Sequence, residues 1–66
     1  MTMLRAINDK LQHPLESLEG DARWLDAYCL GVADTNHPLH NARRALWAAV
    51  RNVRVARAEL EKVREG

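Results

Sequence analysis

The chain of 66 residues is poor in residues that cross-link, bend or interrupt a small fold: it has one cysteine, two prolines, three glycines and no phenylalanine. With Cys29 alone, an intrachain disulfide is excluded, and no cysteine–histidine spacing typical of a zinc module is present. No apolar run approaches the roughly 20 residues of a membrane-spanning helix. We therefore expect no metal, no cofactor and no membrane segment. The free thiol and the absence of a signal peptide predict a cytoplasmic location.

The groups of residues that carry catalysis are also missing. The sequence holds no nucleophile with a base and an orienting group, no phosphate-binding loop and no cluster of carboxylates. His37 and His40 are three residues apart, but a metal site needs a fuller ligand set with supporting partners. We assign both histidines to a turn and expect a protein that is not an enzyme.

What the chain does contain is a heptad repeat that runs without Gly or Pro from Leu39 to Val63. This spacing is typical of a long helix that packs one face against a partner helix, and it predicts a helix over residues 38–65. Small residues at the companion positions of the repeat permit a close approach of that partner. The expected seam consists of Leu39, Ala42, Leu46, Ala49, Val53, Ala56 and Leu60.

A second heptad seam occupies the first half of the chain, with Leu18, Ala22, Leu25 and Cys29 as its main members. Pro14 lies within this pattern, and a proline inside a helix removes a backbone hydrogen bond and clashes with the preceding turn. We expect helices over residues 2–12 and 14–33, with Thr2 as a cap. A kinked, nearly continuous helix would preserve the same phase, so both arrangements are open at this point.

Residues 34–38, with the sequence DTNHP, form a short connection rich in turn and cap residues. A connection of this length joins antiparallel neighbours. The fold class we expect is all-α: a single domain over residues 1–66, in which an antiparallel helical hairpin follows a short N-terminal helix. Flanking apolar residues are too numerous for so small a monomer, so we expect a homodimer that forms a four-helix bundle.

Charge is divided between the two halves of the chain. Residues 1–36 hold three basic and six acidic side chains, whereas residues 37–66 hold seven basic and three acidic side chains. The two halves attract one another, so their charges can pair inside the hairpin or the dimer. Alternatively, the basic half is presented to an acidic partner or to phosphate.

Aromatic and arginine residues are the candidates for partner binding, because Trp, Tyr and Arg are enriched at binding hot spots. Trp24 and Tyr28 share one helical face, and Trp47 lies among Arg43, Arg51 and Arg54. These six residues are our expected partner-binding set. In the alternative interpretation, the aromatic residues complete a dimer core and the arginines are paired or solvated.

The leading functional hypothesis is a protein–protein interaction module. Very small Ala- and Arg-rich helical chains without catalytic residues resemble phage- or mobile-element-encoded inhibitors, anti-activators and adaptors that bind a larger host protein. This resemblance is one of type and carries no motif. The expected architecture is also similar to that of the Rop-type hairpin dimers, which implies RNA or DNA binding as an alternative. A third hypothesis is an oligomer that traps a nucleotide with arginine and aromatic side chains.

Overall fold

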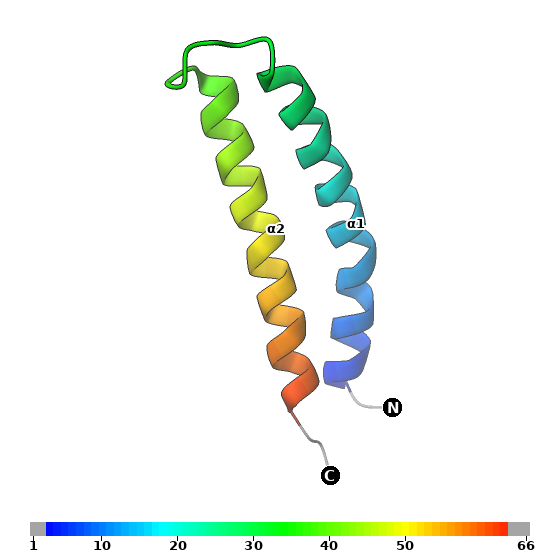
Figure 1. The fold of residues 1–66 in the computed structure, drawn as a ribbon. Coiled ribbons are helices and arrows are strands. Elements are labelled where there is room, and N and C mark those ends of the chain that lie inside the picture. Colours follow the sequence, from blue (N-terminus) through cyan, green and yellow to red (C-terminus); the bar gives the residue numbers. More distant parts are fainter. Residues whose placement is uncertain (1–2, 64–66) are drawn as a thin grey trace.

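Two antiparallel helices make up the computed structural model, which describes residues 3–63. Helix α1 (Met3–Cys29) and helix α2 (Pro38–Lys62) lie side by side and are joined by one turn (Figure 1). The described residues contain no strand, so the all-α hairpin is confirmed. The expected cap at Thr2 lies outside the described residues. Helix α2 ends at Lys62, earlier than the expected residue 65, because the backbone of Val63 is extended.

Helix α1 runs through Pro14 without interruption, so the separate N-terminal helix expected over residues 2–12 is wrong. The nearly continuous helix is the arrangement that forms. Pro14 is exposed, so water can solvate the carbonyl group of Lys10, which has lost its N–H partner. The heptad register is the same on both sides of Pro14. One continuous helix therefore packs all of its inner face against α2.

The end of α1 comes earlier than the sequence predicted, at Cys29 rather than near residue 33. The N–H groups of the next three residues bond to carbonyls three positions earlier, at 3.0–3.3 Å, which tightens the last turn. At the start of α2, the N–H of Leu39 donates to Nδ1 of His37 at 3.0 Å, and Pro38 opens the helix. His40 adds a hydrogen bond of 2.8 Å between its Nε2 and the carbonyl of Val32. His37 therefore caps α2, whereas His40, which was also assigned to the turn, lies within the first turn of that helix.

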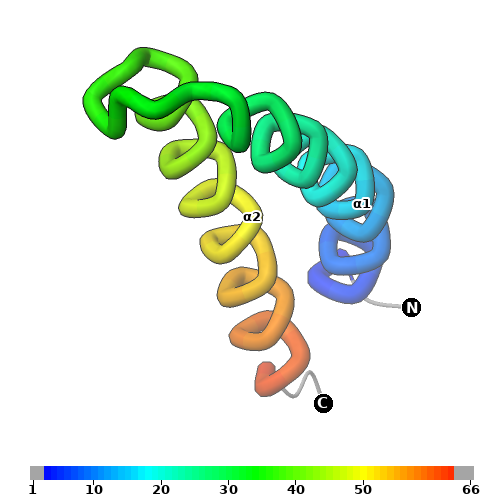
Figure 2. Tube along the Cα trace, turned by 45° about the horizontal axis from the view of Figure 1, so that its top comes forward, coloured from blue at the N-terminus to red at the C-terminus, as the bar shows by residue number. Residues whose placement is uncertain are grey.

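The contact between the two helices is centred on Ala22 and Val50, both of which are completely buried. Leu15 and Cys29 on α1 are the other buried residues of the described chain. Leu15, Ala22 and Cys29 recur every seven positions, in the register of the heptad seam predicted for the first half of the chain. A core this small consists of a single layer between two helices, and residues 3–63 contain no further element that covers it (Figure 2).

On α2 the centre of the contact lies one residue further round the helix than the alanines of the predicted seam, Ala42, Ala49 and Ala56, which we call the alanine seam. Val50 is buried, Ala49 is half-buried, and Ala42 and Ala56 are exposed. One residue corresponds to about 100° of rotation. The alanines of the predicted α2 seam are therefore not the centre of the contact within one chain, although Leu46 and Val53 of the same seam pack against it, and the role of the alanines between chains stays a prediction. The large seam residues, Leu18, Leu25, Leu39, Leu46, Val53 and Leu60, are half-buried.

Gly20 lies inside α1, where a Cβ atom would meet nothing within 4 Å. We expect Gly20→Ala to raise the free energy of unfolding by about 1 kcal/mol, because Ala loses less backbone entropy in a helix. Gly31, which follows the end of α1, is the matched control: Gly31→Ala is expected to change stability much less. Thermal denaturation followed by circular dichroism measures both. An equal gain at the two positions would contradict the helix boundary.

The hairpin is long and thin, with extents of 53 × 17 × 12 Å. Within the described part of the chain, no helix combines the length and the apolar character needed to cross a membrane. Each helix presents its inner stripe to the other and leaves its flanks uncovered. The chemistry of those two flanks decides what the hairpin can bind.

Candidate functional site

One flank of the hairpin is closed by polar contacts between the helices, and we call it the polar side. Trp47 Nε1 donates to Asp26 Oδ1 at 3.0 Å, and the same oxygen lies 3.7 Å from Nη1 of Arg43. Asp26, Arg43 and Trp47 are all half-buried. The indole ring is therefore held against α1 by its N–H group and does not project freely from the surface.

A second group on the polar side is built around the carboxylate of Glu19. Arg54 Nη2 lies 3.0 Å from Glu19 Oε2, and Arg23 Nη2 approaches the same oxygen at 4.0 Å. One half-buried acid is thus shared by two exposed arginines. Nearer the open end, Arg57 Nε donates to Asn8 Oδ1 at 3.0 Å. The ion pairs between the helices join the acidic N-terminal half to the basic C-terminal half.

The opposite flank, which we call the apolar side, follows from helix geometry. In an α-helix, the residue four positions after a buried one lies on one side of it, and the residue three positions after lies on the other. On α1, Glu19 and Asp26 follow Leu15 and Ala22 by four, whereas the half-buried Leu18 and Leu25 follow them by three. On α2, the same rule places the half-buried Leu46 and Val53 opposite Trp47 and Arg54. The alanines at positions 42, 49 and 56 lie on this side as well.

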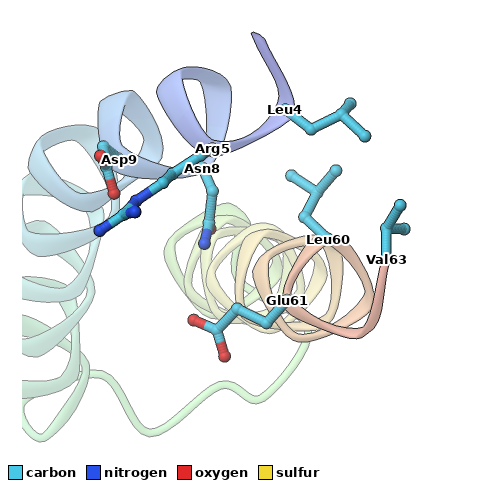
Figure 3. A pocket seen from close by; sticks show the side chains of 7 residues that line it. All are labelled: Leu4, Arg5, Asn8, Asp9, Leu60, Glu61 and Val63. Carbon is cyan, nitrogen blue, oxygen red and sulfur yellow. The ribbon is translucent and has the colours of Figure 1, made fainter. Parts of the chain in front are cut away.

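The open end of the hairpin shows the same division directly. A shallow hollow there lies between the first turns of α1 and the last turns of α2. In Figure 3, the apolar side chains of Leu4, Leu60 and Val63 lie together and apart from the polar side chains of Arg5 and Asp9. The hollow is open and mixed in character. We therefore assign it to the boundary between the two sides rather than to a ligand site.

The structure divides the six predicted partner-binding residues into three places. Arg43, Trp47 and Arg54 are engaged with acids of α1 on the polar side. Arg51 is exposed and forms no hydrogen bond or ion pair with any described residue. It lies one turn from Arg54.

Trp24 and Tyr28, the other two predicted residues, lie on the outer face of α1, with ring centroids 6.0 Å apart. They are 67% and 62% exposed. They do not form one patch with Trp47, whose indole N–H is hydrogen-bonded to Asp26 on the polar side of the hairpin.

The sequence interpretation did not single out Glu19 and Asp26, although they organise the polar side. Their signal was present: two acids seven residues apart on α1 match Trp47 and Arg54, which are seven residues apart on α2. In an antiparallel pair, two such spacings align only at one relative position of the helices. That position could not be read without knowing which face of α2 meets α1.

The described residues contain no group of three His, Cys, Asp or Glu side chains that could hold a metal ion. Cys29 is buried as a free thiol and packs as a small apolar residue. Comparison with protein-family models, with curated proteins and with solved structures finds no match to this chain. The candidate site is therefore defined by the chain's own geometry: a polar side rich in arginine and an uncovered apolar side.

Proposed function

We propose that this chain is a small interaction module that pairs with a second copy in a four-helix bundle and binds a larger protein. The division of the hairpin into two sides supports the proposal. The apolar side leaves half-buried leucine and valine side chains without cover, which a helical partner would bury. The polar side faces away from that contact and carries exposed cations. The bound protein would be inhibited or recruited, and the buried free thiol fits action in the cytoplasm.

The partner surface we propose is the arginine group formed by Arg23, Arg51 and Arg54. Arg23 and Arg54 share the single carboxylate of Glu19, so the group retains excess positive charge. Arg51 has no partner among the described residues, so all its donors are available to a carboxylate of another molecule. Arginine pairs with carboxylates through two parallel hydrogen bonds. This unpaired Arg51 is the observation that carries the proposal, and it indicates an acidic surface on the partner.

Replacement of Arg51 by glutamate tests this surface. We expect Arg51→Glu to lower partner affinity about 30-fold, equivalent to about 2 kcal/mol for a central charged contact. Helicity and oligomeric state should not change, because Arg51 takes part neither in the contact between α1 and α2 nor in the proposed contact between two copies. The measurement is capture of a protein from native lysate, identification by mass spectrometry, and titration of the purified partner with each variant.

Lys62→Glu is the matched control, since it makes the same change in net charge three turns further along the same face of α2. An equal loss with both variants would assign binding to overall charge rather than to the arginine group. Undiminished capture by Arg51→Glu would remove this group as the binding surface.

RNA binding is the second candidate function, because the same arginines can contact phosphate groups. Counterion release makes such binding fall steeply with salt, in proportion to the number of phosphates contacted. Captured material that is destroyed by ribonuclease, with a steep salt dependence, would favour this Rop-like alternative. Nuclease-resistant capture with a shallow salt dependence would favour the protein partner.

A further inference from the structure

The outer face of α1 carries a third heptad pattern, which the hairpin does not use. Its positions alternate in steps of four and three residues, as the contacts of a coiled coil do. Every one of these eight side chains is exposed. We call this set the outer stripe: Met3, Ile7, Lys10, Pro14, Ser17, Asp21, Trp24 and Tyr28.

The outer stripe is self-complementary when it is read in opposite directions. Apolar residues occupy both ends, and their exposures range from 42% for Ile7 to 78% for Met3. The centre of the stripe is formed by Pro14 and Ser17. The basic residue Lys10 lies four positions before Pro14. The acidic residue Asp21 lies four positions after Ser17. No other charged residue belongs to the stripe.

A twofold axis between residues 15 and 16 would therefore place apolar residues against apolar residues and the basic residue against the acidic one. The numbers of the paired residues then add to 31, so Met3 faces Tyr28, Ile7 faces Trp24 and Lys10 faces Asp21 of the second copy. Within one chain, Lys10 and Asp21 are about 16 Å apart along α1, too far to pair. Neither forms a hydrogen bond or an ion pair with any described residue.

From this pattern we propose the arrangement of the dimer: α1 packs antiparallel on α1 of a second copy through the outer stripe, with the two turns at opposite ends. The inference rests on the proposed function in that it requires self-association. Each dimer would contain two Lys10–Asp21 pairs and two Met–Ile–aromatic groups. Such an interface is isologous, because the same residues contribute from both copies.

The exposed surface of the hairpin supports a second copy as the occupant. The chain exposes 5163 Å², whereas a compact protein of its mass exposes about 4,200 Å². Two separate hairpins together expose about 10,300 Å², against about 7,000 Å² for a compact protein of twice the mass. The difference of about 3,300 Å² lies within the range of obligate homodimer interfaces.

Exchange of the two charges tests the arrangement. In a dimer of Lys10→Glu, the new carboxylate of each copy faces Asp21 of the other. In a dimer of Asp21→Lys, the new ammonium group of each copy faces Lys10 of the other. We expect each variant alone to self-associate about tenfold more weakly than the natural chain. The equimolar mixture should recover the natural affinity, because a mixed dimer restores opposite charges at both pairs. Sedimentation equilibrium measures all three, and 1 M salt should reduce the differences.

The position of the turns gives an independent readout. A spin label on Asn36→Cys, in a Cys29→Ala background whose helicity and dimerisation have been checked, reports the distance between the two turns. With the turns at opposite ends, that distance is on the order of 60 Å from the helical rise. With both turns at one end, it would be far shorter.

The possible outcomes separate the two proposals. A natural chain that stays monomeric at high micromolar concentration would overturn self-association itself. A dimer with a short distance between labels, or one that the charge exchanges leave unaltered, would overturn only the antiparallel arrangement. Weakening by each single variant without recovery in the mixture would also overturn it. Recovery in the mixture together with the long distance would establish it.

Discussion

Val50→Asp is expected to leave the chain unfolded under conditions in which the natural chain is fully helical. Val50 is completely buried at the centre of the apolar contact between α1 and α2. The side chains packed with Val50, such as Leu15, Leu18 and Ala22 of α1, are apolar, so the carboxylate would be buried without a partner, at a cost of several kcal/mol. A core of this size supplies about 3–5 kcal/mol in total. The substitution therefore removes all of the stability.

Val55 provides the matched control on the same helix, because it is 52% exposed. Val55→Asp is expected to change the free energy of unfolding by less than about 1 kcal/mol. Far-ultraviolet circular dichroism and urea titration compare the two variants. If Val50→Asp remained as helical as Val55→Asp, the contact centred on Val50 would be wrong, and the alanine seam would have to form the core of the hairpin instead.

Ala56→Glu is expected to abolish self-association and leave at most a weakly helical monomer. Ala56 is exposed on the apolar side of a single chain. Ala22 lies level with Val50 in the hairpin, so Ala56 lies level with residue 16, beside the proposed twofold axis. Two carboxylates would then approach one another at the centre of the dimer. Burial of such charges without partners costs several kcal/mol, which predicts at least a hundredfold loss of affinity.

Ala48→Glu is the control for helix propensity and net charge. Ala48 is also exposed on α2 but lies on the face turned away from the apolar side. We expect this variant to dimerise normally. Sedimentation equilibrium across a range of concentrations compares the two. Equal dimerisation of Ala56→Glu and Ala48→Glu would show that the apolar side is not an interface.

The proposed dimer has a consequence for partner binding. If the apolar sides and outer stripes are buried between two copies, the arginine groups lie on opposite outer surfaces of the bundle. Each dimer would then present two equivalent sites, and the complex would contain two partner molecules per dimer. Trp24 and Tyr28 would belong to the dimer contact. The sequence left two interpretations of Trp24 and Tyr28 open, partner binding and dimer contact. The charge-exchange experiment distinguishes between them.

The amino-acid sequence by itself determined the all-helical character, the turn and the antiparallel hairpin. Periodicity of seven specifies which faces are apolar, and the cap and proline residues near His37 specify where the second helix begins. The division of acidic and basic residues between the halves also indicated that they would pair. These features are local, because each depends on residues within a few turns of one another.

Tertiary packing decided the rest. Pro14 stays within α1 because its position is exposed, and continued packing against α2 outweighs the lost hydrogen bond. The rotation of α2 that buries Val50 rather than Ala49 was also beyond the sequence. Both faces are apolar, and only the alignment of Trp47 and Arg54 with Asp26 and Glu19 selects one of them. Local periodicity states that a helix has a face to bury. Which of two adjacent faces is buried depends on the side chains that the opposing helix brings to it.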